Sequence, residues 1–409
     1  MRVLYVVQRY GEDIAGGAEQ HTRSFAERLV QRGHDVEVLT TSAKSYVDWA
    51  NELEPGFSWC NGVAVRRVPV REPRSAVLFG ELNARMVTTR RARPLALQRE
   101  WMRMQGPDSP RLAQLLRRRA ADHDVVVFIT YLYWTAWAGL RVGAGRVPTV
   151  LHPTAHDEPP LRMSIFDEVL RLPDALAYLT PEEAEVVRDR FPSVPRGEVV
   201  GIGIEPAGAA DPARFRRRFE LGDDPYLLYV GRVDPAKGAA ELTAFFDAYK
   251  RRNPGSLRLV LLGETIVDLG GPRDVVVTGF VDEQTRNDAL AGALALAQPS
   301  YFESFSLVLC ESFAHGRPAL VQGRSAVLAG HAHRSHAAIP YSGFAEFEAA
   351  VDVLIARPEL ADEMGEAGRR YVAREYGWET VLDRYEALLT DVVARRQASS
   401  TMTPAGQLR

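Results

Sequence analysis

The sequence predicts an α/β protein with two halves, each built on a doubly wound parallel sheet. Residues 2–7 (RVLYVV) are short, apolar and rich in β-branched side chains, as expected of a buried strand. A helical pattern follows over about 18–32, and a second strand is expected at 35–41. This strand–helix–strand order favours parallel strands. A second series of the same kind begins with the strand at 226–230, and 409 residues are enough for two domains.

The other elements continue the alternation of strand and helix. In the N-terminal half, further strands are expected at 63–69, 124–130, 147–152, 174–179 and 197–202. In the C-terminal half, further strands are expected at 257–262, 275–280, 294–298 and 318–322. The helices of this half are expected over about 238–251, 282–293 and 306–315. Since ligands of such sheets bind beyond the carboxyl ends of the strands, the turns that follow the strands should carry the chemistry.

Composition divides the chain further. Residues 205–224 are rich in Ala, Pro, Asp and Gly and separate the two series, which indicates a linker. Between 71 and 119 lies a long, Arg-rich stretch with weak patterning. We therefore expect an N-terminal domain over 1–204, a C-terminal domain over 205–378, a closing helix over 379–396 and a flexible tail over 397–409.

The overall composition argues against several classes of protein. A net charge of −3 argues against a nucleic-acid binder, because such proteins carry an excess of positive charge. The two cysteines, Cys60 and Cys310, lie in different halves, which argues against a disulfide framework and favours a reducing compartment. The first residues lack the apolar run of a signal peptide, and no run reaches the ~18 apolar residues of a membrane span. We therefore expect a cytoplasmic protein, at most peripheral to a membrane.

The turn after the first strand of the C-terminal half has the sequence GRVDPAKG, residues 231–238. It opens a helix, where backbone N–H groups and the helix dipole favour an anion. Gly231 lets the backbone approach a ligand, while Arg232 and Lys237 add a fork-shaped donor and a point charge. This combination suits a diphosphate. The alternative is a surface loop with two solvated cations.

A second motif, ESFSLVLCE, occupies residues 303–311. Glu303 lies in a turn after a short strand and can present its carboxylate to sugar hydroxyls. Glu311 lies about two helical turns further on, where a carboxylate can accept hydrogen bonds from both hydroxyls of a ribose. Alternatively, Glu303 only caps the helix and Glu311 is a solvated surface residue. The start of the helix offers N–H groups to a phosphate, and its residues are Ser304, Phe305, Ser306 and Leu307.

Together, GRxxxxKG and ExFxxxxxE resemble the motifs of the retaining glycosyltransferases of family 4, which have the GT-B fold. The resemblance spans nearly the whole chain. It implies two Rossmann-like domains that face each other across a cleft, with a nucleotide-sugar donor in the C-terminal domain and an acceptor in the N-terminal one. It also implies that Arg232 and Lys237 clamp the donor diphosphate, that Glu303 faces the donor sugar and that Glu311 holds the ribose.

The N-terminal half has two further matches to this family. Gly16 and Gly17 follow the first strand, in a loop that in the family lies close to the donor phosphates and the acceptor. His156 follows the strand at 147–152 and resembles the family's histidine near the transferred sugar, with His152 as a second candidate. Without the resemblance, the glycines would be interpreted as an ordinary tight turn and each histidine as a structural residue.

Two departures from the family pattern bear on the donor sugar. Residues 202–205 (IGIE) stand where the family often has Asn-Gly-Val-Asp. Ser304 stands where a glycine usually follows the first glutamate, and the next small residue is Ser306. These changes leave the reaction class intact, but they weaken any inference about which sugar is held.

No metal and no cofactor is expected besides the nucleotide sugar, which is a co-substrate. Residues 122–124 (DHD) superficially resemble the DxD signature of metal-dependent transferases, but they precede a strand and are interpreted as a connector. The three histidines within 325–336 lack the spacing of a zinc site and have no cysteine beside them.

The Arg-rich stretch has two interpretations. Trp101, Met102 and Met104 are interleaved with its arginines, as in a surface that meets anionic lipid or a phosphate-bearing, lipid-linked acceptor. The alternative, which we favour, is a solvated helical hairpin over the acceptor domain. The arginines of this stretch are Arg85, Arg90, Arg91, Arg93, Arg99, Arg103, Arg111, Arg117, Arg118 and Arg119.

The sequence thus predicts retaining transfer of a hexose-type sugar from a UDP- or GDP-sugar to a hydroxyl of a sugar, lipid-linked or small-molecule acceptor. Such a reaction belongs to the synthesis of glycans, glycolipids or glycosylated metabolites. Two alternatives stay open: a sugar-nucleotide epimerase with the GT-B fold, and a sugar-nucleotide-binding relative that has lost turnover. The presence of Arg232, Lys237, Glu303 and Glu311 argues against lost turnover.

Overall fold

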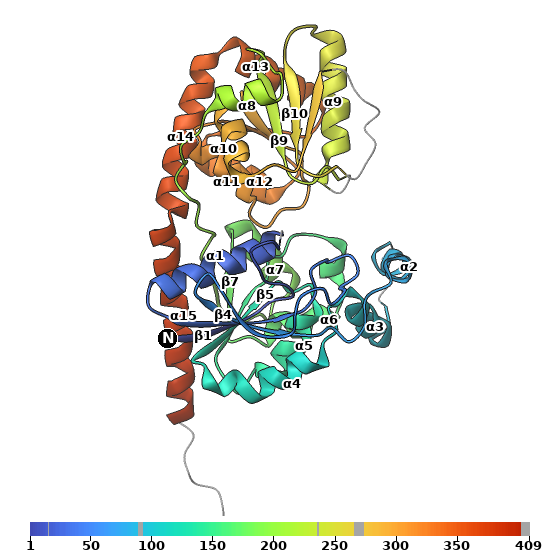
Figure 1. Ribbon diagram of the computed structural model, residues 1–409, viewed down its shortest axis with the longest axis vertical. Helices are drawn as coiled ribbons and strands as arrows, with labels where there is room; N and C mark the ends of the chain where they lie inside the picture. The colour runs from blue at the N-terminus through green and yellow to red at the C-terminus, as the bar shows by residue number, and fades with distance from the viewer. Residues whose placement is uncertain (15, 89–92, 235–236, 266–273, 402–409) are drawn as a thin grey trace, which may run out of the picture. The chain divides into compact units, whose positions relative to one another are not determined.

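A computed structural model describes residues 1–14, 16–88, 93–234, 237–265 and 274–401 (Figure 1). It contains two compact units. Unit 1 consists of Met1–Gly201 and the residues from Leu382 onward, and unit 2 consists of Ile202–Val381. Each unit has its own sheet and its own hydrophobic core. Several residues that the sequence singles out lie outside the described ones, namely Arg90, Arg91, Pro235, Ala236 and the tail residues 402–409.

The sheet of unit 1 has eight strands in the order β3-β4-β2-β1-β5-β6-β7-β8. Neighbouring strands are parallel except β3 and β4, which form an antiparallel hairpin at one edge. Strand β3 is not among the expected elements. Its two-residue turn is Asn61-Gly62, with φ of 49° and 80°, a pair typical of such hairpins. The strands are β1 (Arg2–Val6), β2 (Asp35–Thr41), β3 (Gly56–Cys60), β4 (Val63–Val68), β5 (Val125–Ile129), β6 (Thr149–His152), β7 (Ala175–Tyr178) and β8 (Gly197–Val199).

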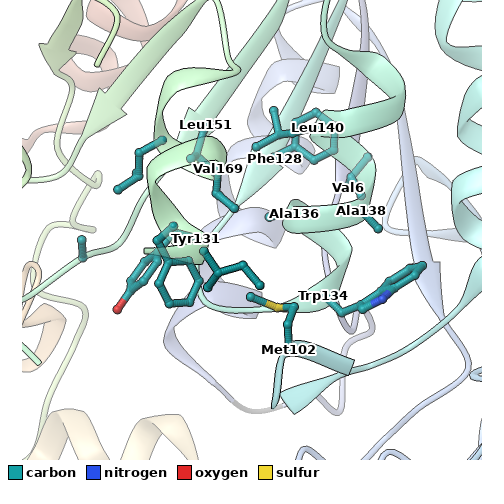
Figure 2. Packing of buried hydrophobic residues seen from close by; sticks show 14 of the residues in the cluster. Val6, Met102, Phe128, Tyr131, Trp134, Ala136, Ala138, Leu140, Leu151 and Val169 are labelled. Atoms are coloured by element: carbon teal, nitrogen blue, oxygen red, sulfur yellow. The ribbon is translucent and has the colours of Figure 1, made fainter. Parts of the chain in front are cut away.

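Helices cover both faces of this sheet: Figure 1 shows α1 and α15 on one side and α4, α5 and α6 on the other. Figure 2 shows part of the core on the α5 side, where Phe128 of β5 lies beside Leu140 of α5. A Cβ on Gly139 would lie 2.4 Å from the Phe128 ring, so this glycine lets α5 approach the sheet closely. The helices are α1 (Gly17–Gln31), α2 (Ala76–Val87), α3 (Leu95–Gln105), α4 (Pro110–Arg119), α5 (Trp134–Gly143), α6 (Ile165–Arg171), α7 (Pro181–Arg190) and α15 (Trp378–Thr401), with 3₁₀ turns η1 (Ala120–Asp122) and η2 (Pro159–Arg162).

The Arg-rich stretch folds into α2, α3 and α4. Trp101 and Met102 of α3 are buried in the core of unit 1, and Figure 2 shows Met102 near Trp134 of α5. The interpretation in which these two side chains lie on a surface available to lipid is therefore wrong, because the apolar face of α3 points inward. The exposed arginines among the described residues of the stretch are Arg85, Arg99, Arg103, Arg111, Arg117 and Arg118.

The sheet of unit 2 has six parallel strands in the order β11-β10-β9-β12-β13-β14. The chain runs outward from β9 to β10 and β11, returns to β12 on the other side of β9, and runs outward again to β13 and β14. This is the doubly wound arrangement. The strands are β9 (Tyr226–Val230), β10 (Arg258–Leu262), β11 (Val275–Gly279), β12 (Ala295–Gln298), β13 (Ala319–Gln322) and β14 (Ala338–Tyr341). The helices are α8 (Pro212–Arg218), α9 (Ala239–Arg252), α10 (Glu283–Gly292), α11 (Leu307–Ala314), α12 (Ala326–Ser335), α13 (Phe344–Ala356) and α14 (Pro358–Tyr376).

The segment 205–224 is not a free linker, because it contains α8. Asp211 caps this helix by accepting hydrogen bonds from two N–H groups of the first turn, at 3.0 and 3.2 Å. Arg214 donates to both carboxylate oxygens of Asp288 in α10, from Nε at 2.5 Å and from Nη2 at 2.8 Å. The expectation of a linker is therefore wrong for this part. The pair Asp211-Pro212 is a helix-start signal that the composition of the segment obscures.

The last helix, α15, begins in unit 2 and continues in unit 1. In unit 2, its first residue Trp378 packs so closely on Gly203 that a Cβ there would lie 2.1 Å from the indole ring. In unit 1, the hydroxyl of Tyr385 is hydrogen-bonded to that of Tyr5 in β1 at 3.0 Å, and its ring meets Phe25 of α1 edge-on. None of the helices formed by the described residues is both long and apolar enough to cross a membrane.

Candidate active site

The turn after β9 takes its shape from two glycines. Gly231 has φ 143°, which side chains disfavour, and its N–H donates to the carbonyl of Leu262 at the end of β10 at 2.9 Å. Gly238, with φ 75°, precedes α9, and a Cβ on it would lie 2.4 Å from the carbonyl oxygen of Pro299. Only glycine therefore lets the start of α9 lie against the loop that follows β12, which carries Glu303.

This close approach brings two of the predicted site residues together. Nζ of Lys237 donates to Oε1 of Glu303 at 3.1 Å, with the lysine side chain 46% exposed and the glutamate side chain 13% exposed. Arg232 donates instead to Asp234, from Nη2 at 2.8 Å and from Nε at 3.1 Å. Asp234 is not among the predicted site residues. An anion bound at this turn would have to compete with both carboxylates for the two cations.

The start of α11 is strained at Ser306. This serine has φ 70° and ψ 73°, in the left-handed region that favours glycine. Its Oγ accepts a hydrogen bond from Nε2 of Gln298 at the end of β12, at 3.0 Å. Ser304, two residues earlier, is not among the residues with positive φ. The backbone position that calls for glycine is 306, because the chain turns left-handed there as it enters the helix.

Phe305 and Leu307, both predicted to line this helix start, differ in burial. The ring of Phe305 is buried and packs edge-on against His331 and Tyr376, with ring centroids 5.6 and 4.9 Å apart. Its side chain is thus a core residue, so only its backbone can face a ligand, whereas Leu307 is half-buried. His331 is itself hydrogen-bonded to the carbonyl of Phe305 at 2.9 Å, and burial lowers its pKa to about 3.

Glu311 lies in α11 with its side chain 18% exposed, and its Oε1 is 3.3 Å from Nη2 of Arg286 in α10. Burial raises the pKa of this carboxyl, and the guanidinium opposes the rise. A mostly buried acid beside a cation is not the solvated surface residue of the alternative interpretation. Arg286 is missing from the predicted site because only the packing of α10 against α11 brings it here.

Three neighbouring strands of unit 2 lead into glycines: Gly231 follows β9, Gly263 follows β10 and Gly279 is the last residue of β11. We call these three glycines the glycine edge. The N–H of Gly263 donates to the carbonyl of Gly279 at 3.0 Å, and a Cβ on Gly263 would lie 2.1 Å from the carbonyl oxygen of Gly231. Next to this bare backbone, the side chain of Phe280 is 85% exposed. Neither Gly263 nor Phe280 is among the predicted site residues, although both stand where an expected strand ends.

In unit 1, the loop before α1 depends on Gly16 but not on Gly17. Gly16 has φ 149°, and a Cβ on it would lie 2.2 Å from Oε2 of Glu19, whereas a Cβ on Gly17 would have no atom within 4 Å. Glu19 is buried and accepts hydrogen bonds from Nε of Arg9 at 2.8 Å and from Nε2 of Gln8 at 2.9 Å. The loop is therefore folded over a buried ion pair, which the sequence pattern does not reveal.

His156 lies in the loop after β6. Its side chain is 26% exposed, and its Nδ1 is 3.7 Å from Oε1 of Glu158. The same Oε1 accepts a hydrogen bond from the hydroxyl of Tyr131, which follows β5, at 2.8 Å. The loop thus presents a partly exposed imidazole beside a carboxylate, an arrangement that can orient a hydroxyl group or relay a proton.

His152, the second candidate, is not accessible. It is the last residue of β6 and is fully buried, with Nδ1 3.1 Å from Nε2 of His21. Its ring meets those of Phe25 and Tyr385 edge-on. Burial lowers the pKa of both histidines, that of His21 to about 3. The candidacy of His152 is wrong because its side chain points into the core between the sheet and the helices α1 and α15.

Within the described parts of the chain, no three His, Cys, Asp or Glu side chains gather as the ligands of a metal ion would. In the DHD segment, η1 ends at Asp122, and Asp124 accepts a hydrogen bond from the N–H of Arg2 at 2.7 Å. The interpretation of this segment as a connector into β5 is therefore confirmed.

Comparison with known proteins assigns both halves of the chain to glycosyltransferases. Residues 16–203 match the family model described as a glycosyl transferase 4-like domain, and residues 212–371 match the model described as glycosyl transferases group 1. The D-inositol 3-phosphate glycosyltransferase of Stackebrandtia nassauensis is 26% identical, over 98% of this chain and 92% of the relative. The GDP-mannose-dependent alpha-(1-6)-phosphatidylinositol monomannoside mannosyltransferase of Mycolicibacterium smegmatis is 27% identical, over 71% of this chain and 82% of the relative.

Solved structures share the fold over nearly the whole length. The sucrose-phosphate synthase of Thermosynechococcus elongatus gives a TM-score of 0.72 at 16% identity, covering 96% of this chain and 99% of that one. The Anabaena protein Alr3699/HepE, in complex with UDP and glucose, gives a TM-score of 0.69 at 16% identity, covering 96% and 100%. The expected GT-B fold is thereby confirmed. With both halves matched by glycosyltransferase models, the chain is an enzyme that belongs to family 4 of the glycosyltransferases.

Proposed function

We propose that this glycosyltransferase moves a hexose-type sugar from a UDP- or GDP-sugar to an acceptor hydroxyl, with retention of configuration at the anomeric carbon. The observation that carries the proposal is the pair Lys237 and Glu303, 3.1 Å apart where the starts of α9 and α11 converge. A cation for the phosphates and a carboxylate for the sugar hydroxyls lie side by side there, as the binding of a nucleotide sugar requires.

The diphosphate would bind at the two helix starts. Each start has backbone N–H groups without partners in its own helix, and Arg232 adds a second cation to Lys237. As the bond between sugar and diphosphate breaks, negative charge grows on the leaving phosphate, and positioned cations stabilise it. Lys237 and Arg232 would then exchange their contacts with Glu303 and Asp234 for contacts with the phosphates, which leaves Glu303 available to the sugar.

The nucleoside would lie along the glycine edge of unit 2. Phe280 offers an exposed ring for stacking of the base, and uracil and guanine both have a face that can stack on it. Glu311 offers a carboxylate to the two ribose hydroxyls, and Arg286 beside it favours the ionised form against the effect of burial. In this arrangement the main chain of the three glycines approaches the nucleoside directly.

The acceptor would bind to unit 1, beside the Gly16 loop and His156. Relatives of this chain are named for inositol 3-phosphate and for a phosphatidylinositol monomannoside, both of which carry a phosphate on a polyol. We infer an acceptor of the same chemical class. The exposed Lys44, two residues from the buried Ser42 that follows β2, supplies a positive charge at the carboxyl edge of the unit 1 sheet for such a phosphate.

In the proposed reaction, the acceptor hydroxyl attacks on the face from which the diphosphate leaves. The bond from the anomeric carbon to the diphosphate breaks, the bond to the acceptor oxygen forms, and the hydroxyl proton passes to an oxygen of the leaving phosphate. His156, oriented by Glu158, would hold a hydroxyl of the transferred sugar. Exclusion of water during the transfer would limit hydrolysis of the donor.

For the Arg-rich stretch we propose the solvated interpretation. Since Trp101 and Met102 are buried, lipid contact would depend on the exposed arginines, at roughly 1 kcal/mol for each one near an anionic surface. Flotation with phosphatidylglycerol and phosphatidylcholine vesicles at physiological salt tests this. Binding to the anionic vesicles alone would reverse the proposal.

A thermal-shift screen of nucleoside diphosphates and nucleotide sugars tests the donor assignment. A ligand at 100 times its dissociation constant adds about 2.7 kcal/mol of stability. The donor found in the screen is then incubated with inositol 3-phosphate and with inositol, and NMR gives the anomeric configuration of the product. The absence of a shift with every nucleotide would overturn the proposal, and conversion of the donor to an epimer without acceptor would support the epimerase instead.

A further inference from the structure

Glu183, in the first turn of α7, is a buried carboxylate that serves more than its own helix. Thr180 caps α7 by accepting a hydrogen bond from the N–H of Glu183 at 3.1 Å. The Glu183 carboxylate accepts hydrogen bonds from the N–H of Leu179, just before the helix, at 2.6 Å, and from the N–H of Ala155 at 2.7 Å. A glutamate at this position commonly caps its own helix, but Ala155 belongs to the loop after β6. One carboxylate thus ties that loop to the start of α7.

The loop that Glu183 holds is strained. Thr154 has φ 51°, and Thr130, which follows the neighbouring strand β5, has φ 58°. Left-handed backbone is costly for a β-branched residue and persists only where the surroundings fix it. The two turns are also joined to each other, because the N–H of Thr130 donates to the carbonyl of His152 at 2.8 Å. Strain held in this way marks a loop whose geometry matters.

The carboxylate itself is costly to bury. Burial raises the pKa of Glu183, and the surrounding backbone N–H groups, including those of Thr154 and Ala155, act in the opposite direction because they stabilise the anion. The capping hydroxyl of Thr180 already satisfies an N–H of the helix start. A buried carboxylate at this place is explained if the loop after β6 depends on it. That loop carries His156, whose side chain is partly exposed.

We infer that Glu183 is a positioning residue whose carboxylate fixes the left-handed turn at Thr154 and, through it, the place of His156. The inference rests on the role proposed above for His156. Glu183 is buried and acts through the backbone of the loop, without touching substrate.

Hydrogen exchange of the full chain tests the structural part without any substrate. In Glu183→Gln, one of the two carboxylate oxygens becomes an NH2 group, which donates and cannot accept. Only one of the N–H groups of Leu179 and Ala155 can then keep its acceptor. We expect the amides of 152–158 to exchange about tenfold faster or more, while those of β1 and β5 keep their rates. Glu185→Gln, which changes an exposed residue of the same helix, should leave all rates unchanged. Equal exchange in the two variants would overturn the inference.

Steady-state kinetics with the donor found in the screen and inositol 3-phosphate test the functional part. Glu183→Gln should lower kcat about 10- to 100-fold and leave the KM for the donor within about twofold, because the donor residues belong to unit 2. Adding Thr154→Gly removes the left-handed strain and should recover about five- to tenfold of the lost kcat. An unchanged kcat, or no recovery in the double variant, would count against the role of Glu183.

Two further variants separate the ways in which this can fail. Glu183→Asp keeps the carboxylate but shortens the side chain by one methylene. It should change the exchange rates and kcat in the same direction as Glu183→Gln, but by a smaller factor. It replaces Glu183→Gln if that variant does not fold. His156→Ala should also lower kcat. A normal His156→Ala enzyme would refute the proposed role of His156, whereas a defective His156→Ala beside a normal Glu183→Gln would refute only the role of Glu183.

Discussion

The carboxyl edges of the two sheets are shaped by opposite means. In unit 2, the turns at the edge use Gly231, Gly238 and Gly263, which adopt conformations or contacts that a side chain would prevent. In unit 1, the turns after the central strands use Thr130 and Thr154 in left-handed conformations. Glycine adopts such conformations without steric cost, whereas a strained threonine has to be held by other groups. The edge of the unit 2 sheet therefore exposes bare backbone, whereas tertiary hydrogen bonds hold the strained turns at the edge of the unit 1 sheet.

Each edge has an exception that clarifies the difference. Ser306 is left-handed in unit 2, and it is held by Gln298 as the threonines of unit 1 are held by their neighbours. In unit 1, Gly16 makes room for the buried carboxylate of Glu19. The comparison teaches that glycine is used where main chain must come close to another group. Held strain is used where one side chain must keep a fixed place.

The largest effect should come from adding a methyl group at Gly238. Gly238→Ala would place a Cβ 2.4 Å from the carbonyl oxygen of Pro299, at φ 75°. Because this neighbour is backbone, the turn must shift, and we expect a loss of about 3–5 kcal/mol in the stability of unit 2 together with loss of donor binding. Denaturant unfolding and calorimetry measure the two quantities. Gly255→Ala, at an exposed position with open space, should change stability by less than about 0.5 kcal/mol. Equal stability and equal donor binding in the two variants would contradict the requirement for glycine at position 238.

A large catalytic effect is expected from Lys237→Ala. Removing one positioned donor from a developing negative charge typically costs ~3–4 kcal/mol, so kcat should fall about 10²- to 10³-fold. Arg251→Ala removes an exposed cation from α9, the helix that follows Lys237, and serves as the control. If both variants turned over the donor at the rate of the unmodified enzyme, Lys237 would be the solvated surface cation of the alternative interpretation.

Low pH should destabilise unit 1, because this unit also contains a buried charged group away from the carboxyl edge of its sheet. Burial alone would raise the pKa of Glu37 in β2, but His123, Arg119 and Arg66 outweigh it and hold the pKa at about 2. Because this value lies below the ordinary 4.5, the charged form stabilises unit 1 above about pH 4.5, and the contribution is lost as the pH falls toward 2. We expect a loss of about 2–3 kcal/mol over this window. Thermal melts should show a flatter pH dependence for Glu37→Gln, and an equally steep one would contradict the assignment.

The smallest effect is expected at the exposed end of the glycine edge. Phe280→Ala should raise the KM for the donor about 5- to 20-fold, since stacking of one base contributes ~1–3 kcal/mol, and it should leave stability nearly unchanged because the ring is 85% exposed. Phe57→Ala, which removes an exposed ring from β3 in unit 1, provides the control. A donor KM that does not move would exclude Phe280 from the nucleoside site.

Most of the fold could be predicted from the sequence because buried parallel strands are short apolar runs that alternate with helical patterns. Strand β3 escapes this rule, since its sequence GFSWC mixes polar and exposed residues on an edge. The pair Asn61-Gly62 was nevertheless a usable signal for its hairpin. Helix α8 escapes it for another reason: its segment has the composition of a linker, and its contact with Asp288 is visible only once the chain is folded.

The site shows the same division. Lys237 and Glu303 could be named from motifs at the ends of strands, and the fold brings them together. Ser306, Arg286 and Glu183 could not be placed correctly, because each depends on tertiary structure. A left-handed φ, the packing of two helices and a hydrogen bond to a residue 28 positions away leave no periodic trace in the sequence.

Helix α15 also constrains how this protein can be made. Tyr385 covers Tyr5 and Phe25 in unit 1, and Glu386 binds His34 at 2.7 Å. A ribosome therefore releases all of unit 2 before it releases the segment that completes unit 1. The nascent first domain has to keep one face bare throughout that interval. A product that terminated early would expose this face permanently, and chaperones and proteases act on such exposed faces.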